Sequence, residues 1–155
     1  MMKNKAFITG ITGFAGSHLA ELLLQENYQV HGTARPRSKT DNIDHIKNKL
    51  YLEDADLLDS HSLYAILRKI KPDYVFHLAA QSFVQTSWAS PATTMETTVV
   101  GTVHLFEAVR RAEIEPVIQI ACSSEEYGLV LPSEVPVKET NPLRPLSPYA
   151  VSKVA

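Results

Sequence analysis

The chain has 155 residues, of which 45% are hydrophobic and 21% are charged; this balance is typical of one globular domain and excludes a disordered or membrane-spanning protein. The net charge of −2 excludes a basic surface for nucleic acid or anionic lipid. The single cysteine, Cys122, excludes a disulfide framework and a cysteine zinc cluster, and the apolar run over residues 6–11 is too short and glycine-broken for an export signal, so we expect a cytoplasmic protein without a metal site.

The first half of the chain alternates short apolar runs with helical patterns. Residues 6–8 predict a buried strand that ends in a glycine turn. From Ser17 to Asn27 the pattern predicts a helix with Leu19, Leu22 and Leu23 on its buried stripe. A second strand (29–33), a short helical piece (41–47) and a weak third strand (50–52) follow. A helix capped by Ser60 comes next, and its apolar residues recur with helical spacing at Leu63, Ile66, Leu67 and Ile70.

The second half continues the alternation as far as a proline-rich stretch. The pattern predicts a strand (74–78), a long polar loop (82–94), an amphipathic helix and a fifth strand (117–121). The apolar stripe of that helix is expected to be Met95, Val99, Val103, Phe106 and Val109. Residues 128–146 should be irregular because each proline lacks a backbone donor, and Pro148 suits the first turn of a last helix. The order predicts an α/β fold, a doubly wound parallel sheet of Rossmann type.

Ligands of such sheets bind at the carboxyl ends of the strands, and a glycine-rich segment lies at the first of these ends. Gly10, Gly13 and Gly16 flank Phe14 and Ala15 between the first strand and the first helix. Glycines there allow the backbone to approach a pyrophosphate, and the helix N-terminus offers free N–H groups to it. The alternative is a glycine turn that serves packing only, so the prediction of a dinucleotide site depends on its position after a strand.

The end of the second strand carries a basic loop where many NAD enzymes have a carboxylate. Arg35 and Arg37 follow the strand, and the first acidic residue is Asp41. Guanidinium groups suit a 2′-phosphate, which predicts NADP, with NAD as the alternative cofactor. A solvated basic loop without a ligand is the other interpretation.

Further cofactor contacts are predicted at the next two strand ends. Asp56 could accept a hydrogen bond from the adenine amino group with Leu57 against the ring, although a plain surface turn explains Asp56 nearly as well. After the fourth strand, Leu78 and the small Ala79 and Ala80 would let a ribose or nicotinamide lie against the backbone. We interpret His77 as a buried histidine with satisfied hydrogen bonds, and Cys122 as a small core residue.

Four residues suggest proton-transfer chemistry. Tyr149 and Lys153 are four residues apart at the start of a helix and therefore share one face. A nearby ammonium favours the phenolate, so the pair suits an alcohol–ketone conversion, whereas an ordinary helix-surface pair is the alternative. Ser123 and Glu125 follow the fifth strand; Ser123 could bind the reacting oxygen. Glu125 could move a carbon-bound proton or protonate a leaving hydroxyl, unless it is a capping or surface residue.

Four segments, GITGFAG, HLAAQS, SSEEYG and SPYAVSK, occur in this order across the whole chain. Together they resemble the extended short-chain dehydrogenase/reductase family. Within that family the chain is similar to the GDP-mannose 4,6-dehydratases and to the GDP-4-keto-6-deoxy-mannose reductases. The resemblance implies a GDP-sugar substrate, contacts to it from Gln81, Ser82, Ser123 and Ser124, and cofactor contacts from Tyr149 and Lys153. Ser123 falls where the dehydratases carry Thr, and Glu125 where they carry their catalytic Glu.

The implied reaction is a dehydration with internal hydride transfer. Tyr149, helped by Ser123, would remove the O4 proton while NADP takes the C4 hydride, and Glu125 would remove the C5 proton and assist loss of the C6 hydroxyl. The alternatives are a ketoreductase, then a C4 epimerase, then a dinucleotide-binding protein without catalysis. We expect residues 1–155 to be the NADP-binding part of a longer enzyme, inactive by itself, which forms a homodimer or homotetramer through the helix over 95–112.

Overall fold

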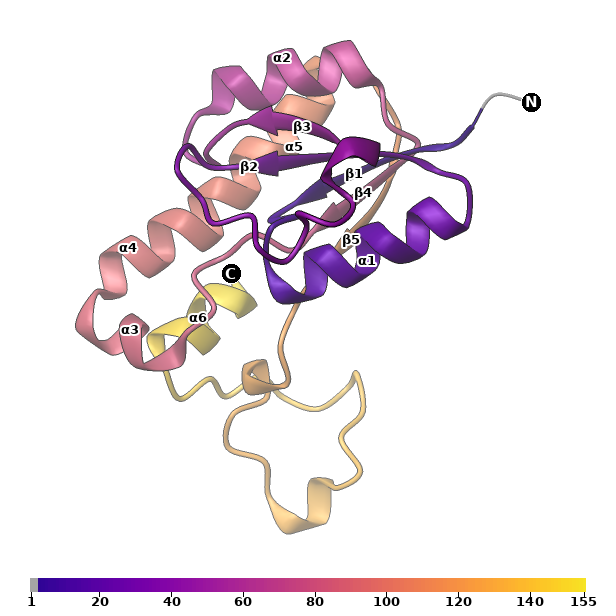
Figure 1. Cartoon of the computed structure of the whole chain (residues 1–155). Helices are drawn as coiled ribbons and strands as arrows, with labels where there is room; N and C mark the ends of the chain where they lie inside the picture. Colours follow the sequence, from indigo (N-terminus) through magenta and orange to yellow (C-terminus); the bar gives the residue numbers. More distant parts are fainter. Residues whose placement is uncertain (1–2) are drawn as a thin grey trace. The chain divides into compact units, whose positions relative to one another are not determined.

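The computed structural model describes residues 3–155 (Figure 1). They form two compact units, the first of residues 3–79 and Gly101–Ala121, the second of Ala80–Val100 and Cys122–Ala155. The described residues contain no helix that is both long enough and apolar enough to cross a membrane.

The first unit is built on a five-stranded parallel sheet. Its strands are β1 (Lys5–Thr9), β2 (Gln29–Ala34), β3 (Tyr51–Asp54), β4 (Tyr74–His77) and β5 (Val117–Ile120). Their spatial order is β3-β2-β1-β4-β5, and every neighbouring pair is parallel. The predicted doubly wound sheet is therefore confirmed. The direction of winding reverses beside β1, which is the position where such sheets bind ligands.

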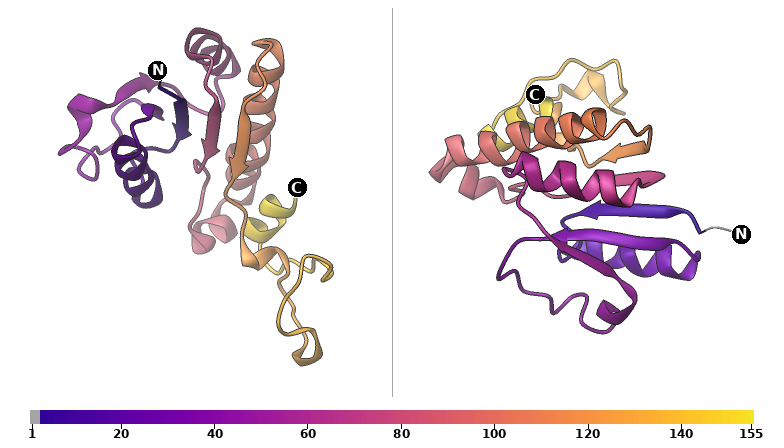
Figure 2. Two further views of the ribbon diagram at one scale, coloured as in Figure 1. Left: turned by 90° about the vertical axis from the view of Figure 1, so that its right-hand side faces the viewer. Right: turned by 90° about the horizontal axis from the view of Figure 1, so that it is seen from above.

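Helices cover both faces of this sheet. α1 (Phe14–Gln25) lies on one face, and α2 (Ser60–Ile70) and α5 (Gly101–Arg111) lie side by side on the other (Figure 2). Successive residues of β1 point to opposite faces, so Ala6 and Ile8 pack under α1 and Phe7 packs under α2 and α5. β1 is thus buried from both sides, which holds the glycine turn after it on a rigid support.

The helix boundaries depart from the predictions where turns begin. α1 begins at Phe14, three residues before the predicted start, because the glycine turn leads directly into it. Its buried residues are Gly16, Ser17, Ala20 and Leu23, whereas Leu22 is exposed, so the predicted stripe was partly wrong. The stripe of α2 is confirmed, but its cap is Asp59, whose carboxylate accepts from the backbone of His61 and Ser62. The helical piece predicted over 41–47 is wrong, because residues 41–46 form turns that lead into a 3-10 turn at Lys47–Lys49.

The single helix predicted through Met95 and Val109 is wrong. The segment forms α4 (Pro91–Met95), a π-helical stretch (Glu96–Val100) and then α5. A π-helical stretch rotates the following turns relative to a continuous α-helix, and in α5 the buried side chains are Leu105, Ala108 and Val109. Val103 and Phe106 are exposed instead. Gly101 starts α5, where a Cβ would lie 2.9 Å from Cβ of Leu57.

The second unit is helical and irregular. It contains α3 (Val84–Ala89), α4, the π-helical stretch, two 3-10 turns (Ser124–Glu126 and Pro132–Glu134) and α6 (Pro148–Val154). The predicted polar loop over 82–94 is wrong, because α3 and α4 both pack against α6. Ser87 and Thr94 are fully buried in this packing. Tertiary contacts therefore stabilise helices that the polar sequence did not indicate. Pro148 occupies the first turn of α6, as predicted.

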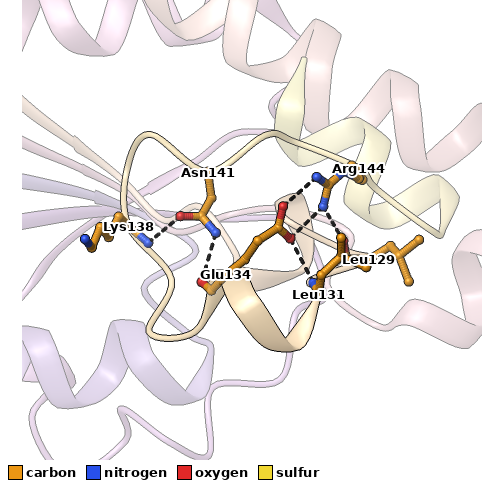
Figure 3. A network of polar contacts seen from close by, with 6 residues as sticks. All are labelled: Leu129, Leu131, Glu134, Lys138, Asn141 and Arg144. Atoms are coloured by element: carbon orange, nitrogen blue, oxygen red, sulfur yellow. Dashed lines mark hydrogen bonds and ion pairs between the residues drawn. The ribbon is translucent and has the colours of Figure 1, made fainter.

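The proline-rich stretch is irregular as predicted, but one carboxylate organises it (Figure 3). Arg144 donates two hydrogen bonds to Glu134, at 2.6 and 2.8 Å, and the backbone N–H of Leu131 donates another at 2.8 Å. Asn141 accepts from the backbone N–H of Lys138 and donates to the Glu134 carbonyl. The guanidinium of Arg144, followed by the Leu131 N–H, lowers the pKa of Glu134 to about 2.

We expect Glu134→Gln to open this loop, because the amide carries no charge for Arg144 to bind. Trypsin should then cleave after Lys138 several-fold faster than in the wild type. The loop should stay closed above pH 4.5, the ordinary pKa of Glu134, and loosen as the pH falls through about 2. Glu139→Gln changes an exposed carboxylate of the same loop and is the control; equal cleavage of the two variants would contradict this account.

Candidate active site

The glycine turn between β1 and α1 uses its three glycines in different ways. Gly10 has a φ of +74°, and a Cβ there would lie 3.0 Å from the backbone nitrogen of Ala79 at the end of β4. A Cβ on the buried Gly16 would collide with the carbonyl oxygen of Gly10 and lie 2.9 Å from Cα of Ile11. Gly10 and Gly16 are therefore required by the packing of the turn itself.

Gly13 is the exception, because no contact among residues 3–155 requires a glycine at this position. It is exposed, its φ of −74° is open to any residue, and a Cβ would meet only the Gly10 carbonyl, at 3.3 Å. Gly13 is also the N-cap of α1, whose first turn has no side-chain cap and no acidic residue. Phe14 and Ala15 beside it are exposed as well. The N-terminus of α1 has no side-chain cap, and Gly13 in front of it has no side chain. The phosphates of a dinucleotide could therefore reach the free backbone N–H groups there.

These differences predict opposite outcomes for two alanine substitutions. Gly16→Ala should lower the free energy of unfolding by about 1–3 kcal/mol, because the new methyl group overpacks a rigid turn. Gly13→Ala should cost less than about 1 kcal/mol but weaken binding of a dinucleotide, because the methyl group would stand where we expect the phosphates to approach. Urea unfolding and a cofactor titration of both variants measure these effects. Equal losses of stability would contradict the assignment.

The other predicted cofactor residues of the first unit lie at the ends of its strands. Arg35 is exposed just after β2. Asp56, after β3, accepts from the backbone N–H of Leu58 at 2.9 Å, and Leu57 is buried in the core below α2 and α5. Leu78 and Ala79 follow β4 and are half-buried. Asp56 thus forms a local surface turn, the alternative given above for this residue, and Leu57 is only 7% exposed.

His77 is buried and hydrogen-bonded, as expected. Its Nδ1 lies 2.8 Å from Oγ1 of Thr9, and its Nε2 lies 3.0 Å from Oγ1 of Thr102. The same Thr9 hydroxyl accepts from the backbone N–H groups of Leu78 and Ala79. This network ties the end of β4 to the end of β1, and so fixes the backbone beside Gly10.

In the second unit, Ser123 and Glu125 lie on the 3-10 turn Ser124–Glu126. Ser123 is its N-cap and accepts from the backbone N–H of Glu125 at 3.2 Å. Glu126 completes a capping box, because its Oε1 accepts from the backbone N–H of Ser123 at 2.9 Å. The two neighbouring carboxylates therefore differ: Glu126 points back into the turn, whereas the Glu125 side chain is exposed and reaches Ser147.

Tyr149 and Lys153 share one face of α6, as their spacing predicted. The Lys153 ammonium lies 5.9 Å from the centroid of the Tyr149 ring. Burial lowers the pKa of Lys153, opposed by the charges of Cys122 and Glu126 nearby. Desolvation, followed by the nearby Glu126, raises the pKa of the Cys122 thiol. Cys122 itself is exposed, so its assignment to the core was wrong.

The predicted substrate contacts of this unit have different surroundings. The side chain of Gln81 closes a turn with the backbone of Phe83, at 2.6 and 3.0 Å. Ser82 and Ser124 are exposed, and Ala80, which was predicted as a cofactor contact, is half-buried. Gln81 is therefore already engaged within its own loop, whereas the two serines face solvent.

The sequence analysis did not include two residues of the second unit, Ser147 and Glu126, among the candidate site residues. Ser147 caps α6 and also contacts Glu125, and Glu126 holds Ser123 through the capping box. A signal for Ser147 was present, because a serine directly before a proline at the first helical position is typical of an N-cap. Its second contact connects residues 22 positions apart, which no local pattern indicates.

The family model and the curated relatives that the sequence matches belong to one family. The family model described as "GDP-mannose 4,6 dehydratase" matches residues 7–155. A GDP-mannose 4,6-dehydratase of Vibrio cholerae is 45% identical over 99% of this chain and 44% of its own length. The Homo sapiens protein named GDP-mannose 4,6 dehydratase is 39% identical over 98% of this chain and 44% of its own length. The chain thus spans less than half the length of these curated relatives.

Solved structures with related sequences share the fold. A Thermus thermophilus UDP-glucose 4-epimerase, solved in complex with NAD, superposes with a TM-score of 0.85 at 32% identity, over 96% of this chain and 47% of that one. A UDP-N-acetylglucosamine 4-epimerase of Methanobrevibacter ruminantium superposes with a TM-score of 0.85 at 31% identity, over 99% of this chain and 48% of that one.

Proposed function

The chain belongs to the GDP-mannose 4,6-dehydratase family, and from this premise we propose that the whole protein converts GDP-mannose into a GDP-4-keto-6-deoxy-hexose. The observation that carries the proposal is the exposed carboxylate of Glu125 beside Ser123 on one turn, with Tyr149 and Lys153 on the helix that this turn contacts. A ketone reduction needs the serine, the tyrosine and the lysine. The carboxylate is required only when a carbon-bound proton must also be removed.

We propose that residues 1–155 are the dinucleotide-binding part of the enzyme. Gly13, Phe14, Ala15 and Gly16 would bind the pyrophosphate through the backbone at the N-terminus of α1. Asp56 and Leu57 would hold the adenine end, and Leu78, Ala79 and Ala80 the nicotinamide end. Epimerases with the same fold are described with NAD, and for this chain Arg35 favours NADP.

Each catalytic residue has one role in the proposed reaction. When bound, the dinucleotide would supply hydride-transfer chemistry, as acceptor of the C4 hydride and as donor of that hydride to C6. Tyr149 takes the O4 proton, Lys153 stabilises its phenolate, and Ser123 donates a hydrogen bond to O4. Glu125 removes the C5 proton and delivers it to the C6 hydroxyl, which departs as water. After the hydride has reached C6, Glu125 takes a proton from solvent and passes it to C5, and Tyr149 releases the O4 proton to solvent. Gln81, Ser82 and Ser124 would contact the GDP-sugar.

The test is to incubate the whole protein with GDP-mannose and a trace of NADP. A GDP-4-keto-6-deoxy-hexose in large molar excess over the cofactor supports the proposal, because the hydride is returned in every turnover. The GDP-4-keto-6-deoxy-mannose reductase is the competing function. It would leave GDP-mannose unchanged and would consume stoichiometric NADPH only with the pre-formed ketone.

The choice of cofactor depends on Arg35 in this account. We expect Arg35→Ala to weaken NADP binding about tenfold or more relative to NAD, the effect of losing a charge-assisted hydrogen bond to the 2′-phosphate. Lys39→Ala removes a cation from the exposed part of the same loop and should leave the ratio unchanged. Titration of both cofactors by fluorescence measures the ratio, and an unchanged ratio in Arg35→Ala would exclude this role.

We propose in addition that the whole protein forms a homodimer or homotetramer and that it is located in the cytoplasm. The exposed side chains of Val103 and Phe106 on α5 support the former, since apolar side chains of this size on one helix favour association. Light scattering of the whole protein measures the oligomeric state.

A further inference from the structure

Ser147 lies at the junction between the helix that carries Tyr149 and Lys153 and the turn that carries Glu125. Its backbone is extended (φ −139°, ψ 158°), and its hydroxyl accepts from the backbone N–H of Ala150 at 3.0 Å. Ser147 is only 8% exposed. It therefore satisfies one of the otherwise unpaired N–H groups at the start of α6.

The same hydroxyl makes a second contact. Its Oγ lies 3.3 Å from Oε2 of Glu125. A serine hydroxyl has one proton and two lone pairs, so it can accept from Ala150 and donate to Glu125 at the same time. Because the carboxylate oxygen can only accept, the direction of this bond is fixed. Hydrogen bonds of this length are common in active sites without a bound ligand.

Glu125 is otherwise an exposed side chain on a short turn. A free glutamate samples several rotamers, and fixing it costs conformational entropy. Glu126, its neighbour, is held by the capping box and points back to Ser123. For Glu125, the bond from Ser147 is the one that directs the carboxylate toward the helix of Tyr149 and Lys153.

We infer that Ser147 is a positioning residue that orients the Glu125 carboxylate for removal of the C5 proton. This role rests on the proposed function. It links oxidation at C4 to proton removal at C5. One hydroxyl bonds both the N-terminus of α6, which carries Tyr149 and Lys153, and the Glu125 carboxylate on the neighbouring turn. The Ser147 hydroxyl thereby sets the direction of the Glu125 carboxylate relative to α6, and this role needs no contact between Ser147 and the substrate.

The two parts of the reaction can be measured separately in the whole protein. Incorporation of solvent deuterium at C5 of GDP-4-keto-6-deoxy-mannose, with oxidised NADP bound, reports proton transfer by Glu125. The change in nicotinamide absorbance on mixing with GDP-mannose reports oxidation at C4, which depends on Tyr149 and Lys153. A merely structural role of Ser147 in α6 would slow both measurements together.

The informative variant is Ser147→Gly, because glycine is a tolerable N-cap but lacks the hydroxyl. We expect it to slow the C5 exchange about tenfold, the loss of one hydrogen bond to a charged group, while C4 oxidation stays within about threefold of the wild type. Ser147→Thr restores the hydroxyl and should recover the exchange. Ser147→Asp keeps a strong cap without a donor, so it should be slow as well and serves if the glycine variant does not fold.

Ser152→Ala is the matched control, because it removes another buried hydroxyl from α6, one that donates to the Tyr149 carbonyl at 2.7 Å. It should not change the ratio of the two rates. Equal slowing of both measurements in Ser147→Gly, or no slowing of the exchange, would overturn the positioning role. A wild-type protein that neither exchanges C5 nor dehydrates GDP-mannose would instead overturn the proposed function.

Discussion

Glu125→Gln should lower the rate of dehydration by about 10²–10⁴-fold, the usual contribution of a positioned acid or base. The amide keeps the size and the hydrogen-bonding distance of the side chain, but it can neither take the C5 proton nor deliver one to the C6 hydroxyl. Oxidation at C4 should persist, because Tyr149 and Lys153 are untouched. Steady-state product formation and C5 exchange in deuterated water measure the two effects.

Glu126→Gln is the matched control for this variant. Glutamine can complete a capping box as glutamate does, so Ser123 stays in place and the rate should fall by less than about tenfold. If Glu126→Gln loses activity and Glu125→Gln keeps it, the proton transfer belongs to the carboxylate that the structure turns toward Ser123. Wild-type dehydration in Glu125→Gln would by itself remove Glu125 from the mechanism.

Tyr149→Phe should abolish oxidation at C4, with a loss of about 10²–10⁴-fold, and should therefore stop both dehydration and any reduction of the ketone. The phenyl ring retains the packing of the side chain on α6, so binding of the dinucleotide should be little affected. The variant differs from Glu125→Gln in a measurable way, because C5 exchange of the pre-formed ketone needs Glu125 but not the tyrosine hydroxyl. Exchange should thus survive in Tyr149→Phe.

Tyr64→Phe removes a phenol from α2, where Arg68 donates to it at 3.1 Å, and it is the control for a lost tyrosine hydroxyl. Its kinetics should match those of the wild type. If Tyr149→Phe loses C5 exchange to the same extent as C4 oxidation, then Tyr149 is needed for the site as a whole and not for the transfer of one proton.

The elements that follow from local patterns were predicted correctly from the sequence. The strands are short, largely apolar runs, with Gly10 directly after β1 and Pro72 and Pro116 shortly before β4 and β5. The stripe of α2 repeats at helical spacing on a single face, so the class of the sheet followed directly. The spacing of Tyr149 and Lys153 also fixed their shared face. These features depend on residues that are neighbours along the chain.

The errors arise where distant contacts determine the structure. α3 and α4 are polar and become helical by packing against α6, which comes more than 50 positions later. The π-helical stretch after Met95 shifts the buried face of α5 away from Val103. The link between Ser147 and Glu125 is of the same kind, because a hydroxyl that caps a helix has no sequence signature for its second partner.

The central claim is that one protein removes a hydride from C4 and returns it to C6. It is tested most directly by GDP-mannose that carries deuterium at C4, incubated with the whole protein and a trace of unlabelled NADP. We expect a GDP-4-keto-6-deoxy-hexose with the deuterium at C6, and with a solvent proton at C5 from Glu125. Unchanged GDP-mannose, or an epimerised sugar that retains its C6 hydroxyl and its deuterium at C4, would contradict the account.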